Sequence, residues 1–216
     1  DAKVFRTKDR PIASQRISIQ PASIYAFVLC FLAFLVLLNF NLFTIILALG
    51  SMPLAFTYPL MKRYTYWPQL FLGITFNYGL ILGWSAIHNE VDLAPIIFYL
   101  GAIFWTLGYD TIYGYQDIKD DEIIGLKSTS IKFKGNAKKF LFTCYILLTT
   151  LFLIGGYCMN FSFIYYLFLL IPIFHLFFYQ MKIFNIKNPS SCLIAFKSNN
   201  FFGFIIFLNI LIIKIL

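Results

Sequence analysis

Five of the nine acidic residues lie within thirteen positions of one another, at Asp110, Asp117, Asp120, Asp121 and Glu122. If this segment is helical, Asp110 and Asp117 share a face, and Asp117 and Asp121 lie one turn apart. Carboxylates so close repel one another. Mg²⁺ relieves that repulsion and is usually held by a few carboxylates together with substrate phosphates. The spacing therefore indicates a magnesium and phosphate site, or alternatively a solvated acidic loop balanced by Lys119 and Lys127.

Two basic segments could supply the counter-charge for such a substrate. The chain opens with DAKVFRTKDRPIASQRIS, in which Asp1 is followed by five bases. Further on, AFTYPLMKRYTYWPQ places Tyr58 one helical turn before Lys62. An aromatic ring and a cation that face one cavity suit an anionic ligand with an apolar tail. The alternative is that these bases only anchor the ends of membrane spans.

The composition identifies the elements that must position these residues. Apolar residues make up 60% of the chain, charged residues 12%, and the mean hydropathy is +0.79. A soluble domain has about a quarter of its residues charged, so the chain is predicted to be an integral membrane protein. The 17 bases are dispersed between apolar runs and form no stripe that could read a nucleic acid. The four cysteines show no C-x-x-C spacing and are interpreted as small apolar residues.

Seven apolar segments are long enough to cross a bilayer as helices, at roughly 23–41, 43–61, 68–87, 95–113, 139–158, 161–181 and 200–216. The predicted fold is all-α, a polytopic transmembrane helical bundle in a single domain over residues 1–216. If the spans alternate, sixteen of the seventeen bases lie on one side, which is then cytoplasmic. Asp110 falls at the cytoplasmic mouth of the fourth span, where an ionisable group is a functional candidate.

The acidic segment, YDTIYGYQDIKDDEIIGLKST, resembles the second aspartate-rich motif of the UbiA superfamily of intramembrane prenyltransferases. Within the superfamily it is most similar to the 4-hydroxybenzoate polyprenyltransferases of ubiquinone biosynthesis. The opening stretch is similar to the segment that follows the first aspartate-rich motif. TYPLMKRYTYWPQLFLG resembles the segment after the fourth helix, and NNFFG resembles part of the final helix. The resemblance covers nearly the whole chain.

The resemblance implies nine transmembrane helices around a cavity open to lipid, with Mg²⁺ and a polyprenyl diphosphate held by two aspartate-rich motifs. It implies that Asp1, Asp117 and Asp121 are metal ligands and that Asp110 is the leading acid of the second motif. The implied catalytic set is Asp110, Asp117, Asp121 and Arg63. The implied substrate-binding set is Tyr58, Lys62, Arg63, Lys119 and Arg10.

The first motif of the family runs Asn-Asp-x-x-Asp-x-x-x-Asp, and only its last acid is present here, as Asp1. The first helix and most of the second are missing from the sequence, which agrees with seven spans instead of nine. We therefore expect the chain to be a fragment, and an inactive one, because one metal site lacks most of its ligands.

The resemblance predicts Mg²⁺-dependent transfer of a polyprenyl group from polyprenyl diphosphate to the ring of 4-hydroxybenzoate. The expected location is the bacterial cytoplasmic membrane or the mitochondrial inner membrane, with lipid around the protein and no nucleic acid partner. Two alternatives remain. The acceptor could be haem, a naphthoate or homogentisate, or the chain could be a transporter without enzymatic activity.

Overall fold

The computed structural model describes residues 7–215, and all regular secondary structure in that range is helical. Seven helical stretches are long and apolar enough to cross a membrane, which confirms the predicted number of spans. Four of them are interrupted or composite. The seven stretches are Ile19–Leu37 (α1), Leu42–Tyr64 (α2, η1, α3), Pro68–His88 (α4, α5), Leu93–Gly114 (α6), Ala137–Cys158 (α9), Phe163–Ile183 (α10, η2, α11) and Pro189–Ile215 (α12, α13).

The composite spans divide at defined residues. Their parts are α2 (Leu42–Thr57), η1 (Tyr58–Leu60), α3 (Met61–Tyr64), α4 (Pro68–Phe76), α5 (Tyr78–His88), α10 (Phe163–Phe174), η2 (His175–Gln180), α11 (Met181–Ile183), α12 (Pro189–Lys197) and α13 (Asn199–Ile215). Two short helices, α7 (Ile118–Ile124) and α8 (Thr129–Lys132), lie between the fourth and fifth spans.

The first and last spans begin earlier than predicted. The first ends at Leu37 because the side-chain amide of Asn39 bonds back to the carbonyl of Leu35 at 2.9 Å, and the side chain of Asn41 caps α2. The last span begins at Pro189 because α12 continues almost directly into α13, with Cys192 on its buried face. Prolines and asparagines at the ends of apolar runs thus shift the boundaries.

The break between α4 and α5 is stabilised by one side chain. Asn77 places its amide nitrogen 2.8 Å from the carbonyl of Gly73, 3.2 Å from that of Ala102 and 2.8 Å from the hydroxyl of Thr106. A membrane interior offers no water to satisfy the polar groups at a helix break. Asn77 therefore supplies the partners and fastens α4 to α6.

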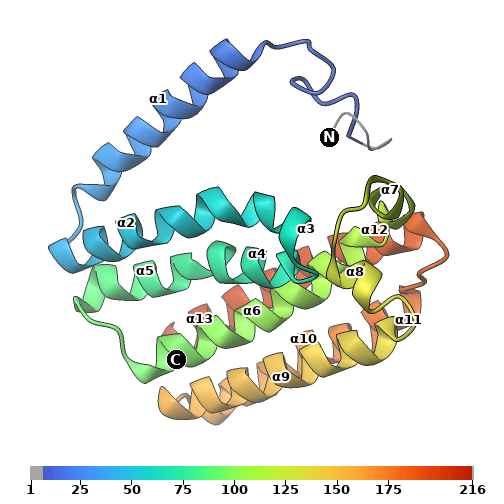
Figure 1. Ribbon diagram of the computed structural model, residues 1–216. Helices are drawn as coiled ribbons and strands as arrows, with labels where there is room; N and C mark the ends of the chain where they lie inside the picture. Colours follow the sequence, from blue (N-terminus) through green and yellow to red (C-terminus); the bar gives the residue numbers. More distant parts are fainter. Residues whose placement is uncertain (1–6, 216) are drawn as a thin grey trace.

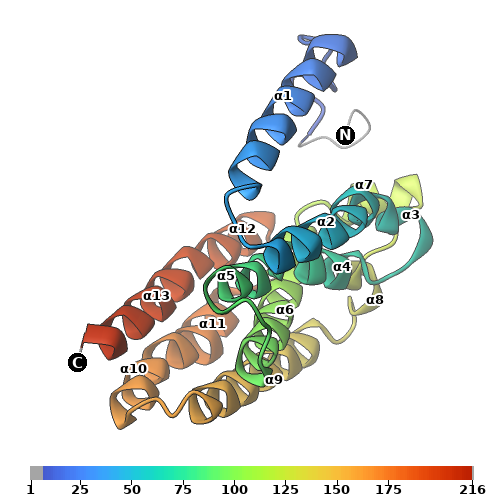
Figure 2. The same cartoon turned by 90° about the vertical axis from the view of Figure 1, so that its left-hand side faces the viewer.

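Helix α6 packs against α9 along the middle of the bundle (Figure 2). The two helices approach closely at glycines of α6 that face aromatic rings of α9. A Cβ atom on Gly101 would lie 2.6 Å from the ring of Phe152, and one on Gly108 would lie 2.9 Å from the ring of Tyr145. Small residues of this kind allow membrane helices to pack by van der Waals contact.

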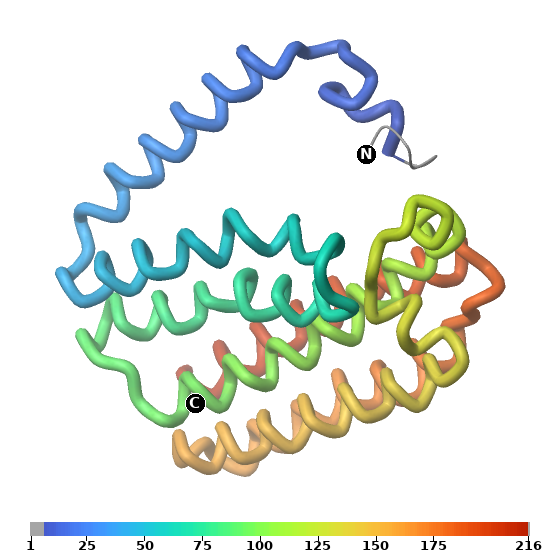
Figure 3. Tube along the Cα trace, viewed as in Figure 1, coloured from blue at the N-terminus to red at the C-terminus, as the bar shows by residue number. Residues whose placement is uncertain are grey.

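The connecting segments lie at the two opposite ends of the molecule (Figure 1). Helices α3, α7, α8, α11 and α12 gather at one end. The turns from α1 to α2, α5 to α6 and α9 to α10 lie at the other. Helix α1 stands apart from the other helices, as the tube in Figure 3 shows, and none of its residues is buried. The fold thus places the acidic segment and most of the bases at the same end.

Candidate active site

The acidic segment leaves the end of α6 and folds into α7. The continuous helix considered from the sequence does not extend beyond Gly114, because the N–H groups of Gln116 and Asp117 bond to Tyr113 and Gly114 in tight turns. The i, i+7 relation between Asp110 and Asp117 therefore does not hold across this break. The relation between Asp117 and Asp121 does hold, since the N–H of Asp121 donates to the carbonyl of Asp117 at 2.9 Å.

Helix α7 ends at a glycine whose backbone adopts the left-handed conformation. Gly125 has φ +77°, and beyond it the N–H of Leu126 turns back to the carbonyl of Asp121 at 2.9 Å. This is the usual way in which a glycine closes a helix. As a result the chain reverses after about two helical turns, and it returns along α3, where the N–H of Lys127 bonds to the carbonyl of Lys62.

Lys62 on α3 forms an ion pair with one of the acids of α7. Its Nζ is 3.9 Å from Oδ2 of Asp121, and its charge also acts on Asp110 of α6. The side chain of Asp121 is 4% exposed, whereas that of Lys62 is 48% exposed. The ion pair thus joins α3 to α7, and its carboxylate is buried while its cation still reaches solvent.

The segment between α7 and α8 is bonded to α3 through Lys127. Its N–H donates to the carbonyl of Lys62 at 2.8 Å, and its Nζ donates to the carbonyl of Tyr64 at 3.2 Å and lies over the ring of Tyr66. Lys127 therefore does not balance the acidic segment, and Lys119 is exposed to solvent on α7. The interpretation of a loop neutralised by these two lysines is not supported by these contacts.

A buried polar cluster, which the sequence analysis missed, holds α8 against the bundle. It consists of Gln69 on α4, Thr111 on α6, and Thr129 and Ser130 on α8. The N–H of Thr129 donates to Oε1 of Gln69 at 3.0 Å, the hydroxyls of Thr111 and Thr129 are 2.6 Å apart, and the hydroxyl of Ser130 donates to the carbonyl of Thr111 at 2.8 Å. All four residues are buried. The only signal in the sequence was the run of hydroxyl residues at the end of the acidic motif.

The remaining predicted residues are spread over three elements. Tyr58 lies half-buried in the 3-10 turn η1, so the α-helical spacing to Lys62 does not apply across it. Arg63 is exposed on α3, beside Lys62. Asp1 lies outside the described residues.

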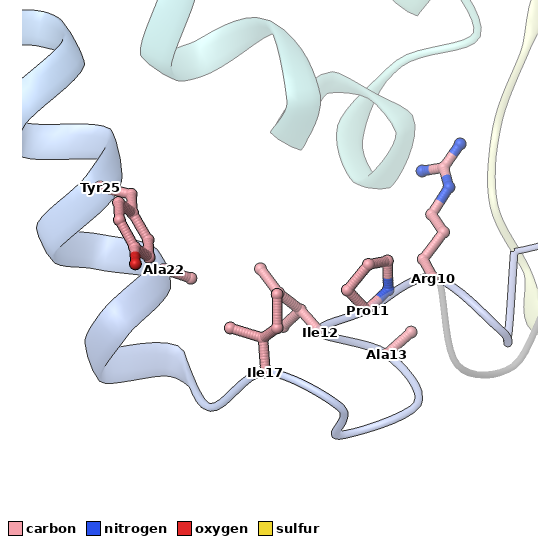
Figure 4. A pocket seen from close by; sticks show the side chains of 7 residues that line it. All are labelled: Arg10, Pro11, Ile12, Ala13, Ile17, Ala22 and Tyr25. Carbon is pink, nitrogen blue, oxygen red and sulfur yellow. The ribbon is translucent and has the colours of Figure 1, made fainter.

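Arg10 belongs to the segment before α1. It lines a hollow with Pro11, Ile12, Ala13, Ile17, Ala22 and Tyr25. Figure 4 shows its guanidinium group turned away from the other six side chains. Arg10 is thus an exposed residue at the edge of an apolar hollow.

Two observations bear on whether the site suits Mg²⁺. Within residues 7–215, no three His, Cys, Asp or Glu side chains come together as a complete metal cage. Glu122 is bound instead by Lys134, whose Nζ is 2.8 Å from Oε1. Asp117 and Asp121 are two carboxylates one turn apart, and Mg²⁺ commonly takes one or two carboxylates together with substrate phosphates. The donor set therefore fits a magnesium ion that arrives with a diphosphate.

Tyr115 lies between the end of α6 and α7, with its ring 5.5 Å from that of Phe184. Burial raises the pKa of its hydroxyl above the ordinary value, and the hydroxyl has no hydrogen-bond partner within the described part of the chain. The group therefore stays protonated and provides a neutral donor two residues before Asp117.

The sequence and the fold of the chain are similar to those of known proteins. The sequence profile of the UbiA prenyltransferase family matches residues 1–209. The chain belongs to that family. The expected resemblance and the helical membrane fold are both confirmed, and this UbiA-family chain is a multi-pass integral membrane protein.

Several of its curated relatives share one name. The chain is 42% identical over 98% of its length to the mitochondrial 4-hydroxybenzoate polyprenyltransferase of Drosophila pseudoobscura pseudoobscura, and 41% identical to that of Homo sapiens. It covers 53% and 57% of those proteins, so the UbiA-family chain spans about half the length of these relatives. It is also 42% identical to 4-hydroxybenzoate geranyltransferase 2 of Lithospermum erythrorhizon, of which it covers 69%.

A solved structure supports the fold. The UbiA-family chain superimposes on a UbiA homologue from Aeropyrum pernix K1 with a TM-score of 0.82 at 22% identity, over 98% of this chain and 78% of that one. The seven spans described above therefore occupy positions in a known helical fold.

Proposed function

We propose that the protein transfers a polyprenyl group from polyprenyl diphosphate to the ring of 4-hydroxybenzoate in an Mg²⁺-dependent reaction. The observation that carries the proposal is the ion pair of Lys62 with Asp121, which lies one helical turn from Asp117, at one end of the helical bundle. Acids and a cation at a membrane surface suit a metal–diphosphate with an apolar tail. The names of the relatives supply the acceptor and the prenyl donor.

In this proposal the residues of the chain bind and orient the diphosphate. Lys62 and Arg63 on α3 contact its oxygens, and Asp117 and Asp121 on α7 would hold the metal. When bound, Mg²⁺ would neutralise charge that develops on the leaving diphosphate. Asp110, half-buried on α6, lies on the bundle side of this group and is available to accept a proton.

The proposed reaction is an electrophilic aromatic substitution. The bond between the first prenyl carbon and the diphosphate oxygen breaks, and its electron pair leaves with the diphosphate. The ring carbon ortho to the hydroxyl group of 4-hydroxybenzoate attacks the resulting allylic cation and forms the new carbon–carbon bond. The ring proton passes to the carboxylate of Asp110, which restores aromaticity. A water-poor site protects the cation from hydrolysis.

We further propose that this step serves ubiquinone biosynthesis in a mitochondrial or bacterial inner membrane. The mitochondrial names of several relatives support the location. The naphthoate, homogentisate and haem acceptors remain outcomes of the experiment below.

The test is an acceptor screen with radiolabelled polyprenyl diphosphate, using membranes that contain a full-length protein in which this chain is joined to a complete first aspartate-rich motif. We expect labelled 4-hydroxybenzoate to form, to disappear with EDTA and to return with Mg²⁺. Asp117→Asn should lower the rate by about a hundredfold or more, because it removes a carboxylate ligand. Lys134→Met, which removes the lysine that pairs with Glu122, serves as the control. Label on a different acceptor would refute the choice of 4-hydroxybenzoate, and no label on any acceptor would favour the transporter alternative.

A further inference from the structure

A second charged feature lies at the same end of the molecule as α7 but on other elements. The segment between α8 and α9 and the segment between α11 and α12 enclose a hollow of about 720 Å³. Both segments lie at the end that also carries α7 and α8 (Figure 1). We call this the lysine hollow, and it is lined by Lys134, Lys138, Lys139, Lys182, Lys187, Gly135, Asn136, Ala137, Phe184, Asn185 and Ile186. Its volume is within the roughly 300–1,000 Å³ typical of small-molecule sites.

The charge in the lysine hollow is not compensated by the protein. Lys134 pairs with Glu122, but the other four lysines have no carboxylate within ion-pair distance among residues 7–215. The sequence explains this, because no Asp or Glu follows Glu122. Lysines that converge on one concavity repel one another, so the hollow favours an anion.

The positive-inside rule alone does not explain this arrangement. That rule accounts for bases on the cytoplasmic side but not for their convergence from two segments about fifty residues apart in sequence. Neighbouring lysines outside the hollow are engaged with the protein. Lys62 contacts Asp121, Lys127 bonds to Tyr64, and Lys132 lies 4.8 Å from the ring centre of Trp67.

The backbone adds positive charge to the lysine hollow. Helix α9 begins at Ala137 in the wall of the hollow, and the side chain of Asn136 does not cap it. The first N–H groups of α9 therefore carry a partial positive charge that adds to that of Lys138 and Lys139.

The surface next to the lysine hollow is apolar. Phe142 on α9 lies about one turn beyond Lys138 and is 47% exposed, and Phe178 on η2 lies one turn before Lys182 and is 61% exposed. The rings of Phe142 and Phe177 meet at 5.2 Å, so α9 and η2 are in contact here. An anionic group in the hollow would therefore have exposed aromatic surface directly beneath it, on the membrane side.

From this combination we infer that the lysine hollow binds the headgroup of an acidic phospholipid, with its acyl chains lying along Phe142 and Phe178. Basic hollows at the cytoplasmic ends of membrane helices are suited to such headgroups. A free phosphate would use only the lysines and would leave the neighbouring apolar surface unexplained. Asp110, Asp117 and Asp121 do not line the lysine hollow, and the inference does not depend on the proposed prenyl transfer.

The experiment is a binding titration of the purified 216-residue chain in neutral detergent, followed by native mass spectrometry. Three probes are compared: phosphatidylglycerol, phosphatidylcholine and inorganic phosphate. We expect the chain to retain phosphatidylglycerol in preference to the other two. The variant Lys138→Gln/Lys187→Gln, which removes one charge from each wall, should bind phosphatidylglycerol about tenfold more weakly.

Two further variants show whether a loss of binding is due to charge in the hollow, to the total charge of the protein or to misfolding. Lys197→Gln/Lys214→Gln removes the same charge from exposed lysines outside the hollow and should bind like the wild type. Lys138→Arg/Lys187→Arg should retain binding. Equal binding of phosphatidylglycerol by the Lys138→Gln/Lys187→Gln variant would overturn the inference. Equal retention of phosphatidylcholine or of inorganic phosphate by the wild type would also overturn it.

Discussion

The hydrogen bond between Gln69 and Thr129 gives a direct test of what holds the acidic segment in place. Oε1 of Gln69 accepts the N–H of Thr129 at 3.0 Å, and the two residues are 3% and 0% exposed. The change Gln69→Leu keeps a side chain of similar length but removes the acceptor. The buried N–H of Thr129 then loses the one acceptor that it has among the described residues.

The cost of such a loss sets the expected size of the effect. A buried donor left without an acceptor costs about 1–3 kcal/mol. The bonds of Ser130 and Thr111 remain. The change should therefore lower the free energy of local opening of α8 and the segment before it, and not the stability of the whole bundle. The open population should then rise by about 5- to 150-fold.

Hydrogen exchange followed by mass spectrometry measures this opening. Amides in residues 117–134 should exchange faster in Gln69→Leu by that factor, while peptides from α9 and α10 keep the wild-type rate. Asn209→Leu is the matched control, because its amide donates to the buried carbonyl of Tyr165 at 3.0 Å, between α10 and α13. It should accelerate exchange there and leave 117–134 unchanged. Wild-type exchange of 117–134 in Gln69→Leu would refute the role assigned to this bond.

Two further changes test the packing and the charge of the site. Gly108→Ala should lower the midpoint of thermal unfolding in detergent, at a cost of about 1–3 kcal/mol, because the added Cβ would lie 2.9 Å from the ring of Tyr145. Gly79→Ala is the control and should have little effect, because its added Cβ would have nothing within 4 Å. Equal losses of stability in the two variants would contradict the packing argument. Lys62→Met should lower kcat/KM for the diphosphate by about 10- to 150-fold, as expected for a lost charged contact. Lys134→Met should leave kcat/KM nearly unchanged. Similar losses in both variants would refute a specific role for Lys62 in binding the diphosphate.

The local features of the site could be predicted well from the sequence. Helix α7 places Asp117 and Asp121 one turn apart because that relation depends only on helical spacing. The number of spans followed from apolar length, and their alternation followed from the bases. The prediction was wrong where one side chain changes a boundary, as at Asn39, or where the helix breaks after Gly114.

Contacts between distant residues could not be predicted in this way. Lys62 and Asp121 are separated by almost sixty positions, and Gln69 and Thr129 by sixty. Neither pair shares a periodic pattern that would identify its partner. The lysine hollow has the same origin, because Lys138 and Lys187 line one concavity only when the fold brings α9 and the segment between α11 and α12 together.

From its apolar lengths and charges alone the chain is a helical membrane protein with its acidic segment and most bases at one surface, because bilayer thickness and the cost of burying charge act on each segment independently. Tertiary structure alone decided which base meets which acid, which polar groups hold α8, and which lysines remain unpaired. These depend on how α3, α6, α7 and α9 pack, and that packing is set by the contacts of many residues together.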